Sequence, residues 1–187
     1  MPPIKKVQRA DIIEASLKIL KTEDISSINA RRIAKELNCS VQPIFYNFKN
    51  MQDLKNEVFK RIYSIYETYM IDGSKQEQAY KGMGIAYINF ARNYPNYFKL
   101  IFMSETNLTS NNYIDNDNDI IEKGMQFTGF DFEKQKGFHL KVWIFTHGLA
   151  TLISTNTVKF SEKEVEKLLQ ESVYEMLMGI KKGKIYE

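Results

Sequence analysis

The sequence has few of the residues from which catalytic and metal sites are built. Its 187 residues include one cysteine and two histidines. The histidines, His139 and His147, lie eight residues apart, whereas the usual helical zinc pair is spaced i, i+4, and no Cys or carboxylate cluster completes a site. A glycine-rich phosphate loop and a nucleophile elbow are also missing. We therefore expect no catalytic activity, no cofactor and no metal, and we interpret His147 as a packed, hydrogen-bonded side chain.

Long apolar runs are absent as well. No segment is apolar enough to span a bilayer, and the first residues, MPPIKKVQR, lack the apolar core of a signal peptide. The single cysteine, Cys39, excludes an internal disulfide and suits a reducing compartment, and we expect it to be a small core residue. With 43% hydrophobic and 26% charged residues, the composition is that of an ordinary soluble globular protein. These features predict a cytoplasmic protein with no membrane partner.

A distinct pattern lies between residues 29 and 48, NARRIAKELNCSVQPIFYNF. Asn29 is a good N-cap for one short helix, and Asn38 suits its end because Asn tolerates the left-handed conformation. We expect a second helix to start at Ser40, with Pro43 in its first turn, where the missing N–H costs least. The pattern predicts two short helices joined by a tight turn.

The second helix of this pair is expected to have two different faces. Ile44, Phe45 and Phe48 form its apolar back. The residues on the opposite face are Val41, Gln42, Pro43, Tyr46 and Asn47. A short helix with an apolar back and such a front fits the major groove of DNA. The amide of Gln42 can pair with adenine, and the ring of Pro43 can contact a thymine methyl group.

Charge is distributed unevenly along the chain. The net charge is only +3, but residues 1–61 carry 12 Lys and Arg against 7 Asp and Glu, a net of +5. Residues 62–187 carry 14 against 16, a net of −2. A basic end on a near-neutral body suits phosphate binding. Because a charge run alone is usually a solvated face, the inference depends on its combination with the helix pair.

The segments IAKELNCS, IFYNF and NMQDL, in this order, resemble the DNA-binding domain of the TetR/AcrR family of bacterial repressors. The resemblance extends from about residue 7 to residue 59, with Asn38 where the family usually has Gly and Met51 where it usually has Lys. It implies that the base edges are contacted by Ser40, Val41, Gln42, Pro43, Tyr46 and Asn47. It implies phosphate contacts from Lys6, Asn29, Arg31 and Lys49. For Tyr46, packing beside Phe45 stays an alternative.

The rest of the chain shows helical apolar spacing almost throughout. We expect a polar loop at 104–119 and further helices at about 8–21, 50–72, 76–93, 95–103, 120–128, 132–155 and 161–180. The segments YINFARNYPNYFKLIF and WIFTHGLATL resemble the C-terminal domains of the same family. The sequence therefore predicts an all-α protein of about nine helices. Residues 1–50 would form a three-helix helix-turn-helix DNA-binding domain, and residues 51–187 a ligand-binding and dimerisation domain.

The middle of the chain is rich in tyrosine and methionine. These residues suit a ligand pocket, because Tyr carries a polar tip on an apolar ring and Met re-packs easily, although each one alone is more often ordinary core. We expect a small, mostly apolar, aromatic or cationic effector to contact Tyr66, Met70, Met83, Tyr87, Phe102, Met125, Trp143 and His147. Glu67, Asp72 or His147 would supply a polar anchor.

The last helix has a broad apolar stripe, part of which a monomer would leave exposed. We expect a homodimer joined by a four-helix bundle of the last two helices, as the family resemblance also implies. The expected interface residues are Gly148, Val165, Leu168, Leu169, Val173, Met176 and Ile180. The function these features predict is a repressor that a small molecule releases from a palindromic DNA operator. The alternative is a helical protein-interaction module without DNA binding.

Overall fold

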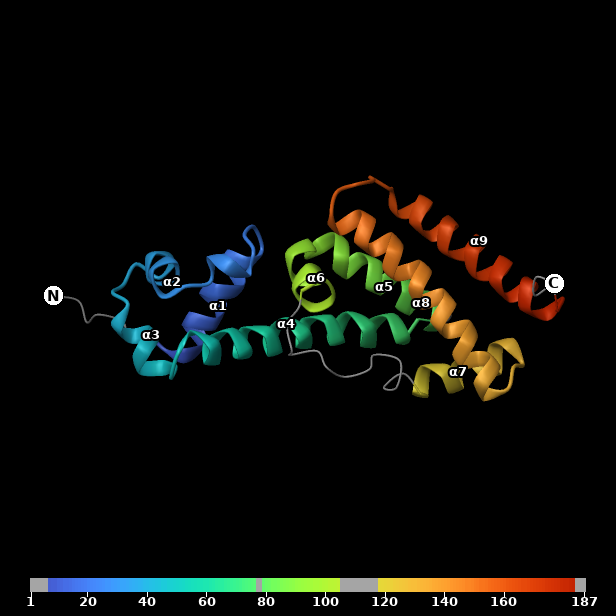
Figure 1. The fold of residues 1–187 in the computed structure, drawn as a ribbon, viewed down its shortest axis with the longest axis horizontal. Coiled ribbons are helices and arrows are strands. Elements are labelled where there is room, and N and C mark those ends of the chain that lie inside the picture. Colours follow the sequence, from blue (N-terminus) through green and yellow to red (C-terminus); the bar gives the residue numbers. More distant parts are fainter. Residues whose placement is uncertain (1–6, 77–78, 105–117, 184–187) are drawn as a thin grey trace. The chain divides into compact units, whose positions relative to one another are not determined.

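The computed structural model describes residues 7–76, 79–104 and 118–183. Within these ranges the chain forms nine α-helices, one short 3₁₀ turn and no β-strand (Figure 1), so the all-α expectation is confirmed. No helix in them is long and apolar enough to cross a membrane. Lys6 and most of the polar loop expected at 104–119 lie outside the described residues. The elements are α1 (Arg9–Leu20), η1 (Ile25–Ser27), α2 (Ala30–Glu36), α3 (Gln42–Asn47), α4 (Met51–Ser74), α5 (Ala79–Asn93), α6 (Pro95–Phe102), α7 (Asn118–Thr128), α8 (Phe132–Ser154) and α9 (Glu162–Lys181).

Backbone contacts divide the chain into two compact units. Unit 1 comprises residues 1–65 and 94–108, and unit 2 comprises residues 66–93 and 109–187, in each case as far as they are described. The division falls within α4 and places α6 in unit 1 with the N-terminal helices. The division by function that we expected, 1–50 and 51–187, follows a different boundary and stays a prediction.

The core of unit 1 is built from the apolar faces of short helices. α1 contacts both α2 and α3. The aliphatic side chains that are at most 2% exposed in this unit include Ile12, Ile19, Leu20, Ile28, Ile33, Ile44, Leu54, Val58 and Ile62. Within each helix they follow the spacing of three or four residues that places side chains on one face. Burial of each such side chain stabilises the fold by roughly 1.5–3 kcal/mol. This burial keeps α2 and α3, helices of seven and six residues, in place.

α6 joins unit 1 through contacts with residues far away in the sequence. It starts at Pro95, at a first-turn position where a missing N–H costs little. The buried Tyr97 hydroxyl donates to the Leu17 carbonyl at 2.8 Å, and the Asn96 side chain donates to the Glu23 carbonyl at 3.2 Å. Burial raises the pKa of Tyr97 to about 12. The sequence of α6, PNYFKLIF, is apolar nearly all round, and its buried residues are Tyr97, Phe98, Leu100 and Ile101.

In unit 2, α8 lies at the centre and contacts α5, α7 and α9, while α5 also contacts α9. Figure 1 shows α5 and α9 on either side of α8. The end of α4 meets α5 at two glycines: a Cβ on Gly73 would lie 2.7 Å from the Gly82 carbonyl oxygen, and a Cβ on Gly82 would overlap the Gly73 carbonyl oxygen. Gly73 is therefore a packing residue within α4, which continues to Ser74, slightly beyond the end expected at residue 72.

Candidate functional site

The helix pair expected at residues 29–48 is present as α2, a turn and α3. The Asn29 side chain accepts a backbone N–H of the first turn at 3.0 Å and caps α2 as expected. Asn38 has a φ of +52°, the left-handed conformation that ends the helix. The expected start at Ser40 is wrong: α3 begins at Gln42, and Val41 occupies the N-cap position without a side-chain capping bond. The turn is longer than expected, so Ser40 lies too early to cap the helix.

The outward surface of α3 carries two aromatic rings and an amide. Gln42 is exposed, Phe45 is 55% exposed and Tyr46 is 83% exposed, so Tyr46 does not pack into the core. The expectation that Phe45 is buried is wrong. α3 has only six residues, and Ile44 and Phe48, four residues apart, already fill its inner side. The further residues expected at the bases are exposed or half-buried: Ser40, Val41 and Pro43.

Asn47 is tied to the backbone around it. Its side-chain amide donates to the Pro43 carbonyl at 2.8 Å and to the Val7 carbonyl at 3.5 Å, and its own carbonyl accepts a hydrogen bond from the Arg9 guanidinium at 2.8 Å. The same guanidinium lies 4.2 Å from the centre of the Phe48 ring. These contacts fasten α3 to the start of α1 and engage the Asn47 amide nitrogen. The expected base contact of Asn47 stays a prediction.

Exposed cations accompany this helix pair. Arg31 and Lys49, both expected at phosphates, are exposed and form no ion pair within the described part of the chain. Lys35 is exposed and equally unpaired, one helical turn after Arg31, so both lie on the same side of α2. We did not single out Lys35 from the sequence, although its i, i+4 spacing from Arg31 was visible. The Asn29 side chain is exposed but is used for the cap.

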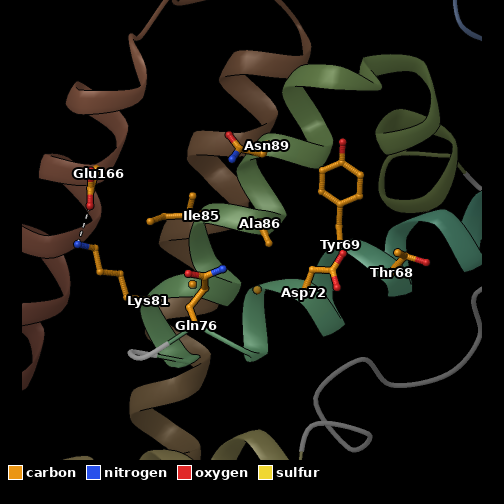
Figure 2. Close-up of a pocket in the computed structure, with 11 residues that line it drawn as sticks. Thr68, Tyr69, Asp72, Gln76, Lys81, Ile85, Ala86, Asn89 and Glu166 are labelled. Atoms are coloured by element: carbon orange, nitrogen blue, oxygen red, sulfur yellow. Dashed lines mark ion pairs between the residues drawn. The ribbon is translucent and has the colours of Figure 1, made fainter.

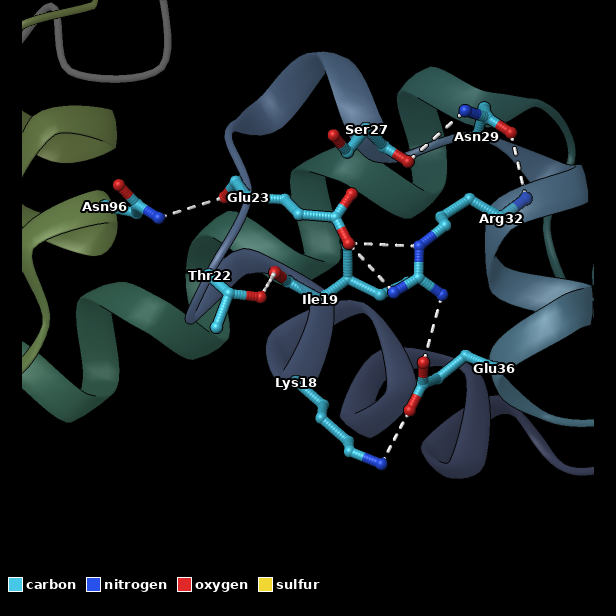
Figure 3. Close-up of polar contacts among 9 residues, drawn as sticks. All are labelled: Lys18, Ile19, Thr22, Glu23, Ser27, Asn29, Arg32, Glu36 and Asn96. Carbon is cyan, nitrogen blue, oxygen red and sulfur yellow. Dashed lines mark hydrogen bonds and ion pairs between the residues drawn. The ribbon is translucent and has the colours of Figure 1, made fainter.

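Arg32, the neighbour of Arg31, has the opposite surroundings (Figure 3). Its Nε and Nη2 donate to Glu23 Oε1 at 3.1 and 2.9 Å, and its Nη1 donates to Glu36 Oε2 at 3.0 Å. Lys18 lies 2.6 Å from the other oxygen of Glu36. The hydrogen bond from Arg32 lowers the pKa of Glu23, and those from Lys18 and then Arg32 lower the pKa of Glu36. Arg32 is therefore a structural residue that joins α2 to α1 and to the loop after it.

Four of the eight expected ligand residues form one cluster in unit 2. The Tyr87 hydroxyl lies 2.8 Å from His147 Nδ1, and the Trp143 ring stacks on the His147 ring with centres 5.2 Å apart. The Tyr66 ring meets the Tyr87 ring edge-on at 6.0 Å. Burial lowers the pKa of His147. The expectation of a packed, hydrogen-bonded His147 is confirmed, and Tyr87, at 3% exposure, is part of the core.

The other four expected ligand residues are divided between the two units. Phe102 belongs to unit 1, where its ring lies 4.9 Å from the ring of Phe98. The remaining three are half-buried in unit 2: Met70, Met83 and Met125. A single effector that contacts all eight residues stays a prediction.

A pocket of about 620 Å³ lies elsewhere in unit 2 (Figure 2). It is lined by Thr68, Tyr69, Asp72, Gly73, Gln76, Lys81, Gly82, Ile85, Ala86, Asn89 and Glu166. None of the eight expected ligand residues lines it, because its α5 residues occupy a different side of that helix from Met83 and Tyr87. Asp72, considered as a polar anchor, does line it. The aromatic content of the sequence did not indicate this pocket, because most of its lining residues are small or polar.

The expected interface residues also fall into two groups. Val165 and Leu169 are 3% and 4% exposed and pack within the single chain. Gly148 is exposed, and the space where its Cβ would lie is open. The remaining four are half-buried: Leu168, Val173, Met176 and Ile180. The spacing of apolar residues in α9 did not show which of them pack against α5 and α8 of the same chain and which are accessible to a second copy.

Comparisons with models of protein families and with curated proteins gave no match. Among the residues that the structure describes, no group of three or more His, Cys, Asp and Glu side chains is arranged to hold a metal ion. The features of the structure that indicate a function are therefore the surface of α3, the cations of α2 and the pocket of unit 2.

Proposed function

We propose that this chain is a sequence-specific DNA-binding transcriptional regulator, a repressor of the TetR/AcrR kind that its sequence resembles. The observation that carries the proposal is the surface of α3, where an amide and two aromatic rings are exposed on a helix whose other side is packed. The exposed cations Arg31, Lys35 and Lys49 of the same unit supply the charge that a phosphate backbone requires.

In this proposal α3 enters the major groove. Gln42 pairs with an adenine through its two amide atoms, and the Phe45 ring contacts a thymine methyl group. Tyr46 lies beside it at the base edges. Arg31 and Lys49 neutralise phosphates, which fixes the position of the helix without reading sequence. Asn47 holds α3 on the start of α1 through its backbone contacts.

The direct test is a selection of bound sequences from a random DNA library, followed by affinity measurements at several salt concentrations. We expect an enriched palindromic sequence, because a symmetric dimer reads two equal half-sites about 34–36 Å apart. Affinity should fall steeply between about 50 and 200 mM salt as phosphate contacts release counterions. A library without enrichment, with binding that does not depend on salt, would instead favour a protein-interaction module.

We further infer that two copies associate through α8 and α9. A line of exposed residues runs along α8: Gly137, Lys141, Ile144, Gly148 and Leu152. Their spacing of three or four residues keeps them on one face, and the open space at its two glycines lets a second helix approach closely. Because Val165 and Leu169 are already buried, the apolar contact would come from Ile144 and Leu152, which are 56% and 41% exposed.

The Ile144→Arg variant tests this surface. A charge placed in the interface should give monomers in sedimentation and weaken operator binding, since a single subunit reaches only one half-site. The matched control is Ile71→Arg on α4, which changes an equally exposed isoleucine (55%) outside α8 and α9 and should leave the dimer intact. A wild-type protein that sediments as a monomer at micromolar concentration would exclude the dimer.

The proposed regulator responds to a small molecule in unit 2. α4 is one continuous helix that begins in unit 1 and ends in unit 2, so it provides a covalent route between the two. A ligand changes DNA affinity only by the difference between its affinities for the two states, and DNA must change ligand affinity by the same factor. Titration of a ligand with and without operator measures this factor, and identical affinities would show that the ligand is not an effector.

A further inference from the structure

The pocket of unit 2 is bounded by two contacts between α4 and α5. At one end, Gly73 and Gly82 bring the two helix backbones together. At the other, the Asn93 side chain donates to the Tyr69 hydroxyl at 3.1 Å. The space of about 620 Å³ along these helices is also lined by Glu166 of α9 (Figure 2). The glycines therefore form part of the pocket wall through their backbones, and the pocket is a consequence of how the helices cross.

The chemistry of the lining favours a hydrophilic ligand. Hydroxyl groups come from Thr68 and Tyr69, and side-chain amides come from Gln76 and Asn89. Apart from the Tyr69 ring and the glycines, apolar surface comes from two residues of α5, Ile85 and Ala86. A ligand that is mostly apolar would cover the side-chain amides of Gln76 and Asn89 without giving them partners, which costs free energy. A short carbon chain with polar ends would satisfy both kinds of surface.

The charges of the lining residues indicate which end group the pocket prefers in a ligand. Among the lining residues that the structure describes there are two carboxylates, Asp72 and Glu166, and one ammonium group, that of Lys81, a net charge of −1. Lys81 Nζ lies 2.6 Å from Glu166 Oε1, which offsets both charges on that side of the pocket. Asp72 also forms an ion pair, through Oδ1 with Lys75 at 2.9 Å, but both of these side chains are exposed and Lys75 does not line the pocket. Because an ion pair between two exposed side chains is weak, the Asp72 carboxylate is the acidic group among the described lining residues that a ligand can most easily engage.

We propose that this pocket binds a small hydrophilic amine. Its ammonium group pairs with the Asp72 carboxylate, its carbon chain lies against Ile85 and Ala86, and its other polar end meets the amides of Gln76 and Asn89. This differs from the mostly apolar effector that the aromatic content of the chain led us to expect. Binding of the amine needs no DNA. Its action as an effector would rest on the regulatory function proposed above.

Three probes of equal length test the charge preference: 4-amino-1-butanol, 1,4-butanediol and 4-hydroxybutanoate. Each is titrated into the full-length protein, and backbone amide signals are followed by NMR, which reports both location and affinity. We expect saturable shifts at the amides of Gly73, Gly82 and Asn89 with the amine. The diol should bind about three-fold more weakly, as expected for the loss of one exposed charge pair. The carboxylate should bind most weakly of the three.

The Asp72→Asn variant should remove the preference for the amine over the diol. The matched control is Glu171→Gln, which removes an exposed carboxylate of α9 that does not line this pocket, and it should keep the preference. The proposal is overturned if the amine gives no saturable shifts at these amides, or if Asp72→Asn retains the full preference. Because no DNA is present, either result leaves the DNA-binding proposal standing. Failure to select a DNA sequence would likewise leave the amine site standing.

Discussion

Aromatic side chains in two regions of this chain have opposite surroundings. On α3, Phe45 and Tyr46 are 55% and 83% exposed, whereas on α5 Tyr87 and Phe90 are 3% and 0% exposed. The cause is the number of neighbours that each helix has. α3 has six residues and one packed side, while the fifteen residues of α5 meet α7, α8 and α9. Aromatic residues therefore mark a candidate binding surface in the first region and a core in the second.

The largest expected effect contrasts phenylalanine truncation in the two regions. Phe90→Ala removes a fully buried ring that meets the rings of Tyr66 and Tyr69 edge-on, so the free energy of unfolding should fall by ~3–5 kcal/mol. Phe45→Ala removes an exposed ring and should change it by less than ~0.5 kcal/mol. Denaturant unfolding of both variants measures the difference. Equal losses would mean that the two regions do not differ as their exposures indicate.

The second contrast concerns DNA affinity and compares a residue expected at a phosphate, Arg31, with one expected at a base, Gln42. Arg31→Ala should weaken binding to all sequences alike and reduce the salt dependence, because the variant loses one contact between a cation and a DNA phosphate. Gln42→Ala should cost ~1–3 kcal/mol mainly at one base position. Quantitative binding to a set of operator variants separates the two patterns. An unchanged base preference in Gln42→Ala would contradict the placement of α3 in the groove.

Arg32→Ala is the matched control for Arg31→Ala, because the two arginines are neighbours on α2. Its guanidinium is engaged by Glu23 and Glu36, so its loss should lower the stability of unit 1. Per DNA-binding-competent molecule, it should leave the salt dependence of binding as it is in the wild type. If Arg32→Ala instead reduced the salt dependence as much as Arg31→Ala, the structural role of Arg32 would be wrong.

Local signals were sufficient to predict most helix boundaries. The cap at Asn29, the left-handed Asn38 and the proline in the first turn of α6 act within a few residues, so the sequence alone contains them. The exposure of Phe45 was not predictable in this way. Ile44 and Phe48 already fill the packed side of α3, and the sequence does not show that this side is too narrow to include Phe45.

Long-range packing was the part that the sequence did not reveal. The pocket is lined by residues from three separate segments, α4 with Gln76, α5, and Glu166 of α9, and no short motif joins them. Val165 and Leu169 belong to an apolar stripe that looks the same whether it faces its own chain or a second copy. Tyr97 is buried in unit 1, and its hydrogen-bond partner Leu17 lies 80 residues away in the sequence. These contacts are set by how helices cross.

A smaller effect is expected from removing single hydroxyl groups. Tyr97→Phe leaves the ring in place but deletes the buried hydrogen bond to the Leu17 carbonyl, which should cost ~1 kcal/mol of unfolding free energy. Tyr46→Phe deletes an exposed hydroxyl on α3 and should cost nothing measurable in the absence of DNA. Thermal or denaturant unfolding compares the two. A Tyr97→Phe protein as stable as the wild type would show that this hydrogen bond does not help to hold α6 in unit 1.

The smallest expected effect is a pH dependence carried by His147 in the buried aromatic region. Burial lowers the pKa of its imidazole below 6.5 in the folded chain, whereas the unfolded chain keeps the ordinary value. Above pH 6.5 the group is neutral in both states, and its contribution to stability is fully present. As the pH falls below 6.5 the unfolded state binds the proton first, so the free energy of unfolding decreases until the pH passes the lowered pKa. Denaturant unfolding across this range measures the slope.

The variant that isolates this contribution is His147→Asn, whose side-chain amide can accept from or donate to the Tyr87 hydroxyl but does not titrate. It should unfold with a shallower pH slope below 6.5 than the wild type, because all other titrating groups are shared. Trp143, the only tryptophan of the chain, stacks on His147 and reports protonation in the folded state through its fluorescence. A fluorescence midpoint at or above pH 6.5, with equal slopes for the two proteins, would contradict the lowered pKa of His147.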